Sequence, residues 1–175
     1  MTKLPLRLIL ENIRSTTNVG SILRTADAFA VEAVYVVGYT PFPRQVDQQD
    51  NRPPHVAYAN TRQIAKTALG AEKSVPVIPL TDIQAAIALM QSEGYHLIVL
   101  EQAENSLTLC DYSPIGPTAL ILGNEVDGVS KAAQTSAETI LEIPMLGQKE
   151  SFGVAVAAGI ALYSLRNGRP AGISR

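Results

Sequence analysis

Residues 141–158 read Leu-Glu-Ile-Pro-Met-Leu-Gly-Gln-Lys-Glu-Ser-Phe-Gly-Val-Ala-Val-Ala-Ala. This pattern predicts a strand, a glycine-containing loop and the start of a helix, with Ser151 well placed as the helix cap. The helix is expected to span residues 152–167, and nearly all of its side chains are small or apolar. A helix that is apolar on all sides must be buried all round, either in the core or in a subunit interface.

The rest of the chain alternates between short apolar runs and helical patterns. Strands are expected at residues 6–10, 33–37, 75–79, 96–100, 118–122 and 140–143. Helices are expected at residues 18–29 and 82–91, capped by Asn18 and by Thr81 or Asp82 respectively. This alternation predicts an α/β fold with a mostly parallel sheet that is flanked by helices on both faces.

Two further segments join a strand to a glycine-containing turn or a helix. Residues 120–129, Leu-Ile-Leu-Gly-Asn-Glu-Val-Asp-Gly-Val, predict a buried strand and a turn with glycines five positions apart. Residues 11–26, Glu-Asn-Ile-Arg-Ser-Thr-Thr-Asn-Val-Gly-Ser-Ile-Leu-Arg-Thr-Ala, predict a polar loop and a helix start, where backbone N–H groups favour an anion. Arg24 is expected to reach along the helix past Gly20 to that opening, or else to pair with Asp27.

The net charge of −2 hides an uneven distribution along the chain. Residues 1–66 carry eight Lys and Arg against five Asp and Glu, a balance of +3, and the remainder carries −5. The first part therefore offers either a local phosphate-binding patch or simply scattered surface charges. The arginines that would form such a patch are Arg7, Arg14, Arg24, Arg44, Arg52 and Arg62.

Other features narrow the class of protein. One cysteine excludes an internal disulfide framework, and two separated histidines offer no metal-ligand spacing. No leader or long apolar run is visible, so we expect a single cytoplasmic domain over residues 1–175 with no membrane partner. The segment 38–54 contains four prolines and is too long for a routine connection, which is typical of a binding loop, while residues 169–175 are expected to form a loose tail.

Taken in order, the three segments resemble the signature motifs of the SpoU, or TrmH-like, family of SPOUT RNA methyltransferases. The matching patterns are Asn-x-Gly-x-Ile-x-Arg-x-Ala, Leu-Gly-Asn-Glu-x-x-Gly and Ile-Pro-Met-x-Gly-x-x-x-Ser-Phe-x-Val-x-Val-Ala-Ala, and the resemblance covers about residues 6–165. It implies a deep trefoil knot within residues 118–165, an exception to the usual rule against knots.

The resemblance also implies a cofactor, an acceptor and an assembly. S-adenosylmethionine would lie in the knot, with no metal, and would be methyl donor to a ribose 2′-hydroxyl of RNA. A homodimer would bring Asn18 and Arg24 near the acceptor ribose, with Glu125 and Ser151 completing the catalytic set. The cofactor contacts would be Leu100, Glu101, Leu122, Gly123, Ile143, Met145, Ser151 and Phe152.

Because an ordinary arginine is a poor base, Arg24 is expected first to grip a phosphate and stabilise developing alkoxide charge, with direct proton removal as the second alternative. The chain departs from the family at Gly153, where an asparagine is usual. This departure leaves open an alternative, an RNA-binding relative with weak or lost transfer. A dinucleotide enzyme is disfavoured because no G-x-G-x-x-G fingerprint is present.

The substrate is the least specified part of the prediction. The chain begins at its first predicted strand, so substrate capture is expected from the catalytic domain itself, with tRNA slightly favoured over rRNA. The RNA-contacting candidates are Arg14, Arg44 and Arg52.

Overall fold

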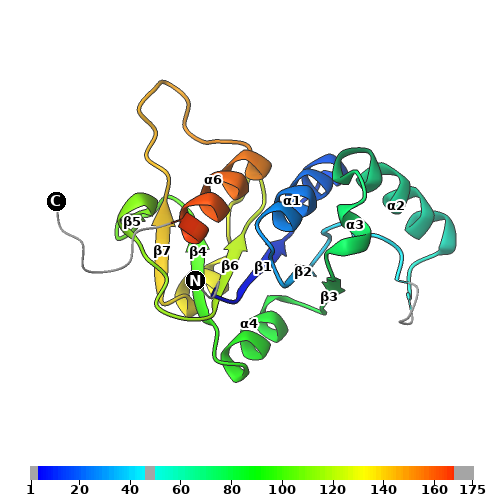
Figure 1. Cartoon of the computed structure of the whole chain (residues 1–175), viewed down its shortest axis with the longest axis horizontal. Helices are drawn as coiled ribbons and strands as arrows, with labels where there is room; N and C mark the ends of the chain where they lie inside the picture. The colour runs from blue at the N-terminus through cyan, green and yellow to red at the C-terminus, as the bar shows by residue number, and fades with distance from the viewer. Residues whose placement is uncertain (1–3, 46–49, 168–175) are drawn as a thin grey trace.

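The computed structural model describes residues 4–45 and 50–167 and has a parallel sheet with helices on both faces (Figure 1). Within these residues the sheet has seven strands in the order β3-β2-β1-β6-β4-β7-β5. All the strand pairings in it are parallel. The strands are β1 (Leu6–Glu11), β2 (Ala33–Val37), β3 (Val77–Pro79), β4 (His96–Leu100), β5 (Leu107–Thr108), β6 (Thr118–Leu122) and β7 (Thr139–Glu142).

Of the two helix caps predicted from the sequence, one is observed and one differs. Asp82 caps α4 by accepting a hydrogen bond from the backbone N–H of Ala85, as predicted. The cap of α1 is Ser15, not Asn18, because the Ser15 side chain accepts from the Asn18 N–H and the helix begins two residues earlier than expected. The helices are α1 (Thr16–Ala28), α2 (Pro54–Ala68), α3 (Ala71–Ser74), α4 (Ile83–Ser92), η1 (Leu109–Asp111), α5 (Lys131–Ser136) and α6 (Val154–Asn167).

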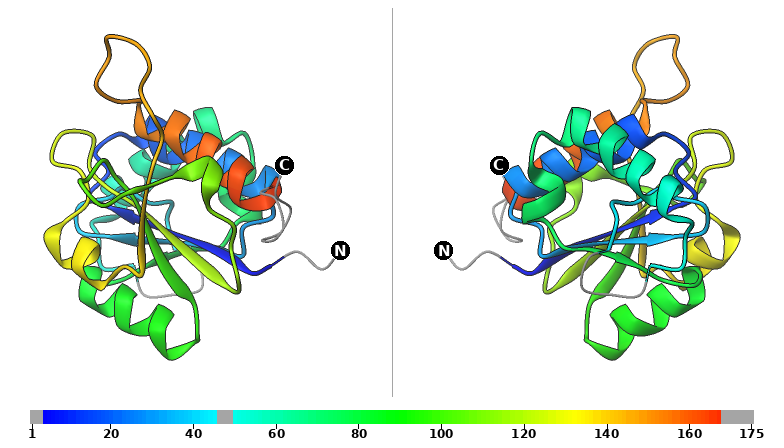
Figure 2. Two further views of the ribbon diagram at one scale, coloured as in Figure 1. Left: turned by 90° about the vertical axis from the view of Figure 1, so that its left-hand side faces the viewer. Right: turned by 90° about the vertical axis from the view of Figure 1, so that its right-hand side faces the viewer.

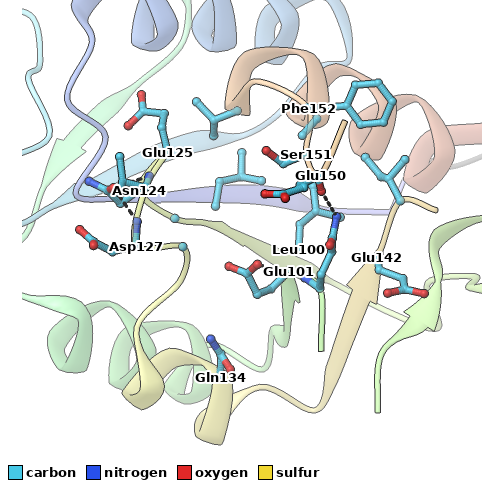
Figure 3. Close-up of a pocket in the computed structure, with 18 residues that line it drawn as sticks. Leu100, Glu101, Asn124, Glu125, Asp127, Gln134, Glu142, Glu150, Ser151 and Phe152 are labelled. Atoms are coloured by element: carbon cyan, nitrogen blue, oxygen red, sulfur yellow. Dashed lines mark hydrogen bonds between the residues drawn. The ribbon is translucent and has the colours of Figure 1, made fainter. Parts of the chain in front are cut away.

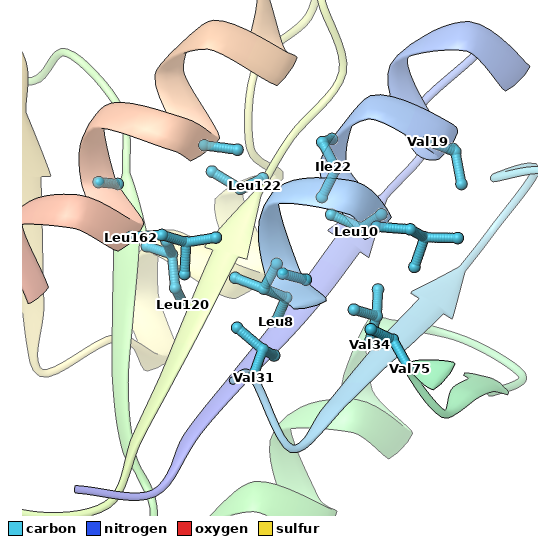
Figure 4. Close-up of a cluster of buried hydrophobic side chains, with 14 of the residues drawn as sticks. Leu8, Leu10, Val19, Ile22, Val31, Val34, Val75, Leu120, Leu122 and Leu162 are labelled. Carbon is cyan, nitrogen blue, oxygen red and sulfur yellow. The ribbon is translucent and has the colours of Figure 1, made fainter. Parts of the chain in front are cut away.

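The sheet separates two hydrophobic cores because successive strand residues point to opposite faces. On β1, Leu8 and Leu10 belong to the core under α1, α2, α3 and α6, whereas Ile9 belongs to the core under α4 and α5. Figure 4 shows Leu8 and Leu10 meeting Ile22 of α1 and side chains of neighbouring strands. Burial on both faces explains why the central strands read as continuous apolar runs.

The predicted α/β class is confirmed, and one long helix was not predicted. Helix α2 follows the proline-containing segment and packs extensively on α1, with Ala57, Ile64 and Ala68 buried. Its first residue is a proline, which suits the opening of a helix because the missing N–H would have had no helical partner. The third predicted strand is also shorter than expected and begins at Val77.

Helix α6 is not buried all round within one chain. It packs on α1, Ala158, Ala161 and Leu162 are buried, and the two helices lie side by side over the sheet (Figure 1). Its other side leaves Val156 and Tyr163 exposed to 55% and 63%. The expectation of full burial is therefore wrong for the single chain, and the interface alternative remains.

The route of the chain after β6 is consistent with the expected knot. The chain crosses to α5 on one face, returns through β7 beside β4, and reaches α6 on the other face. The knot itself stays a prediction, and the expected tail at 169–175 lies outside the described residues. None of the helices in residues 4–45 and 50–167 has the length and apolar character needed to cross a membrane.

Candidate active site

A pocket of about 360 Å³ opens at the carboxyl ends of β4, β6 and β7. Ligands in open α/β sheets bind at this edge, because the loops that follow adjacent parallel strands meet there. The pocket is closed on one side by the turn after β6 and on the other by the segment that leads into α6 (Figure 3). The segments 120–129 and 141–158 thus form opposite walls of one cavity.

Most of the residues predicted to contact the cofactor line this pocket. Met145 is the exception, since the loop between β7 and α6 projects away from the body of the protein (Figure 2). Leu146 in that loop is 99% exposed. The predicted residues that do line the pocket are Leu100, Glu101, Leu122, Gly123, Ile143, Ser151 and Phe152, and Glu125 from the predicted catalytic set joins them.

The turn after β6 needs both of its glycines. Asn124 and Gly128 exchange backbone hydrogen bonds of 3.0 Å, which folds the turn so tightly that a Cβ on Gly123 would lie 2.4 Å from the Gly128 carbonyl carbon. Gly128 has φ +70°, and a Cβ there would lie 2.3 Å from Oε2 of Glu101. Residues with side chains at either position would force the turn open.

Glu101 is tied to this turn. Its Oε2 accepts a hydrogen bond of 2.9 Å from the backbone N–H of Val129, and its Oε1 accepts from the N–H of Gln102. The Gln102 side chain in turn donates to the Glu150 carbonyl at 2.8 Å. One short segment after β4 therefore joins both walls of the pocket.

Glu125 links the first segment to the second. Its Oε1 accepts from Nδ2 of Asn18 at 2.8 Å, and its Oε2 accepts from the Arg14 N–H at 3.4 Å. The guanidinium of Arg14 also lies 3.9 Å from Asp127. Tyr39, by hydrogen bonding, and then these two acids raise the pKa of Arg14, so this arginine stays charged beside the turn.

Two residues near the pocket were not predicted as site residues from the sequence. The buried Asn124 side chain donates to the Asn12 carbonyl at 2.9 Å and lies 2.6 Å from the Tyr39 hydroxyl. Glu11, which is 4% exposed, accepts from the Ser130 N–H at 2.9 Å. An acidic residue directly after a buried strand was the signal that could have identified Glu11, because a buried carboxylate requires hydrogen-bond donors.

Ser151 does not cap α6. The helix begins at Val154, and the Gly153 carbonyl accepts from the N–H groups of Val156 and Ala157, which places Gly153 at the cap. Ser151 lies in the exposed approach to the helix and lines the pocket instead. No atom lies within 4 Å of a Cβ built on Gly153, so an asparagine would fit there without a clash.

Arg24 lies outside the pocket in this chain. It lines a second hollow of about 500 Å³ with Lys66 and Thr67. The expected path past Gly20 is closed, because a Cβ on Gly20 would lie 2.2 Å from the Thr67 hydroxyl and α2 covers that side of α1. Asn18 therefore reaches the pocket edge through Glu125, whereas Arg24 faces away from it.

The three arginines predicted to contact RNA have different environments. Arg14 lies at the pocket edge, and the exposed Arg44 lies with its guanidinium 4.9 Å from the Tyr58 ring centroid. Arg52 is committed to its own loop: it donates to both oxygens of Asp50 and to the Phe42 carbonyl, and it holds the pKa of Asp50 well below its usual range. The structure thus disfavours Arg52 as an RNA ligand.

Comparison with known proteins identifies the family. A sequence model described as the SpoU rRNA Methylase family matches residues 5–163. The chain is 33% identical over 160 residues to the 23S rRNA (guanosine-2'-O-)-methyltransferase RlmB of Ralstonia nicotianae, covering 91% of this chain and 57% of that protein. It is 30% identical to a putative TrmH family tRNA/rRNA methyltransferase of Staphylococcus saprophyticus, covering 93% and 59%. The chain thus spans less than two thirds of these relatives.

Solved structures share the fold. An AdoMet-bound rRNA methyltransferase from Sinorhizobium meliloti has a TM-score of 0.77 at 22% identity, covering 93% of this chain and 56% of the other. The A. aeolicus TrmH/SpoU tRNA modifying enzyme has a TM-score of 0.73 at 23% identity, covering 90% and 72%. The resemblance seen in the three motifs is confirmed over nearly the whole chain: the protein belongs to the SpoU rRNA methylase family.

Proposed function

We propose that the protein transfers a methyl group from S-adenosylmethionine to a ribose 2′-hydroxyl of RNA. The observation that carries the proposal is the pocket at the carboxyl edge, where two of the three family motifs form the walls and the third is tied to the rim through Asn18 and Glu125. The family relatives named for this type of reaction support it.

The pocket suits a ligand with an apolar ring and a positive charge. Leu100, Leu122 and Phe152 supply apolar walls, and about 360 Å³ is within the usual range for small-molecule sites. Among the described residues that line it, none is Lys, Arg or His, which matches a sulfonium ligand. The acidic side chains in the lining are Glu101, Glu125, Asp127, Glu142 and Glu150.

When bound, the cofactor would supply a methyl group activated by positively charged sulfur: as the oxygen–carbon bond forms, the carbon–sulfur bond breaks, S-adenosylhomocysteine leaves, and the hydroxyl proton passes to solvent water. The chain's own task is to hold an acceptor oxygen in line with that group at roughly 3–3.5 Å and to exclude competing geometries. Asn18 and Glu125 order the rim, and Arg24 grips the neighbouring phosphate and stabilises negative charge on the oxygen. The transfer as proposed uses no metal.

The site is completed in a twofold homodimer. Arg24 does not line the pocket of its own chain but a separate hollow. The exposed apolar face of α6 is the natural contact, with Val156, Ile160 and Tyr163 exposed to between 36% and 63%. A symmetric pairing through this face would bring Arg24 of one protomer to the pocket of its partner.

The acceptor is proposed to lie in ribosomal RNA. The relatives named as RlmB act, by their names, on a guanosine ribose of 23S rRNA. The slight preference for tRNA expected from the sequence is not shown by these comparisons, in which relatives named for tRNA/rRNA also occur. A structure concerned with 2-OH methylation of C/U34 on tRNA shares the fold at 20% identity and a TM-score of 0.70, which concerns the fold alone.

The test is transfer of labelled methyl from S-adenosylmethionine to total unmodified rRNA and tRNA, followed by digestion to nucleosides. A labelled 2′-O-methylguanosine from rRNA is expected. Label on a base would overturn the proposed acceptor, and label in tRNA alone would overturn the proposed RNA class.

A second candidate is an RNA-binding relative that no longer transfers methyl groups, which Gly153 favours because it lacks the amide usual in the family. Gly153→Asn distinguishes the two, because the position has room for the side chain. For an active enzyme we expect measurable wild-type transfer and a gain below about tenfold, equal to 1.4 kcal/mol in the barrier. If the wild type shows no methyl transfer and Gly153→Asn does, the second candidate is established. Gly147→Asn is the matched control, because Gly147 also lies in open space.

A further inference from the structure

A row of cationic and aromatic side chains runs along the outer face of α2. Tyr58, Arg62 and Lys66 are each exposed and are spaced four residues apart, so they lie one above another along the helix. Arg44 lies with its guanidinium 4.9 Å from the Tyr58 ring centroid and extends the row at its beginning. Helix α2 itself contains no Asp or Glu. We call these four residues the α2 row.

The α2 row ends beside Arg24. Lys66 and Arg24 line the same hollow of about 500 Å³, where α2 packs on α1. The Thr67 hydroxyl donates to the Thr17 carbonyl at 3.0 Å, which fixes the two helices relative to each other. The row therefore forms a continuous cationic path that leads to the residue proposed to grip the acceptor phosphate.

The cations of this path are free to bind an anion. Other arginines are paired: Arg7 with Glu93, Arg14 with Asp127 and Arg52 with Asp50. Among residues 4–45 and 50–167, in contrast, no carboxylate lies within 4.0 Å of the cationic groups on this path. These groups are those of Arg24, Arg44, Arg62 and Lys66.

We propose that the α2 row binds the phosphodiester backbone of the RNA strand that carries the acceptor nucleotide, an inference that rests on the proposed function. Proteins that hold single strands combine a cationic groove with exposed aromatic side chains, on which bases stack. Tyr58 is 58% exposed and places an aromatic ring among the cationic side chains. An acidic protein partner would use the cations but would not need the exposed part of this ring, on which a base can stack.

The test compares wild type, Arg62→Gln/Lys66→Gln and Lys131→Gln. Lys131 is an exposed cation on α5, on the opposite face of the sheet, so it controls for loss of general charge. Affinity for short single-stranded RNA of mixed sequence and for total unmodified rRNA is measured over a range of salt concentrations. Each lost phosphate contact changes the slope of log affinity against log salt by about 0.7 on a single strand.

We expect the double variant to bind both RNAs at least about tenfold more weakly, with a slope shallower by about 1.4, while S-adenosylmethionine affinity and melting temperature stay unchanged. Lys131→Gln should match wild type. Equal RNA affinities and slopes in the double variant and Lys131→Gln would overturn the proposal that the α2 row binds RNA. A wild type that binds RNA through these residues but transfers no methyl group would overturn the proposed function and leave the α2 row standing.

Discussion

Charged side chains have different partners at the amino ends and at the carboxyl ends of the parallel strands, which we call the amino edge and the carboxyl edge of the sheet. At the amino edge, Arg7 is 16% exposed and satisfies its charge with other side chains: it pairs with Glu93 and Glu32 and lies 4.0 Å from the Tyr95 ring centroid. Side chains that neutralise one another fill the space between them. At the amino edge, the charge of Arg7 is therefore offset by neighbouring side chains.

At the carboxyl edge, three acids accept hydrogen bonds from backbone N–H groups. Glu11, Glu101 and Glu125 accept hydrogen bonds from the N–H groups of Ser130, Val129 and Arg14. Each carboxylate thus fixes a loop without requiring a bulky partner, which leaves a pocket between the loops. The difference indicates that substitutions at the amino edge should alter stability alone, whereas those at the carboxyl edge should alter binding.

The largest expected effect is that of Gly123→Ala. The new Cβ would lie 2.4 Å from the Gly128 backbone, so the turn must open. We expect a loss of about 1–3 kcal/mol in unfolding free energy and more than about tenfold weaker binding of S-adenosylmethionine, measured by urea unfolding and titration calorimetry. Gly147→Ala, in the loop opposite with no atom within 4 Å of its Cβ, should change neither. Unchanged cofactor affinity in Gly123→Ala would remove the turn from the binding site.

A smaller effect is expected for Arg7→Met at the amino edge. It removes the cation between two carboxylates and the ring of Tyr95. Because Glu32 and Glu93 are more than 40% exposed, solvent offsets part of the loss, and we expect about 1–2 kcal/mol in urea unfolding. Cofactor affinity and methyl transfer below the melting temperature should equal those of wild type. A drop in cofactor affinity would show that the two edges are coupled.

The smallest expected effect is on the pH dependence of the unfolding free energy. Burial, and then the hydrogen bond to Glu32, raise the pKa of Tyr95 from 10.0 to about 12. The folded state thus retains a proton that the unfolded chain releases, so this stabilisation is complete below pH 10 and is lost as the pH rises to about 12. Tyr95→Phe should flatten the decline of unfolding free energy across that window. Parallel declines in wild type and variant would mean that other groups, such as Tyr35, cause it.

Much of the fold could be predicted because strands buried on both faces appear in the sequence as continuous apolar runs. The strand at residues 33–37 was predicted with its observed bounds, Ala33–Val37. Helix α2 was missed because its three buried residues include two alanines, which give a weak stripe, and because the prolines before it are typical of a loop. The two residues of β5 are too few to carry any pattern.

The candidate site could be predicted where it depends on local sequence, and less well where it depends on packing. The glycine turn after β6 follows from the local sequence, and its place beside Leu100 was implied by the resemblance to the family. The position of Arg24 does not follow from the local sequence, because it is decided by the packing of α2 over Gly20. The Ser151 cap was wrong by two residues, since helix ends depend on single hydrogen bonds.

The projecting loop between β7 and α6 has a consequence for proteolysis. It exposes Leu146 almost completely, and Lys149 is exposed beside it, which makes this the segment of the described chain best presented to a protease. The same segment leads through Glu150, Ser151 and Phe152, which line the pocket. A single cut there would leave the sheet and both cores intact while severing one wall of the cofactor site, so that loss of binding would precede loss of fold.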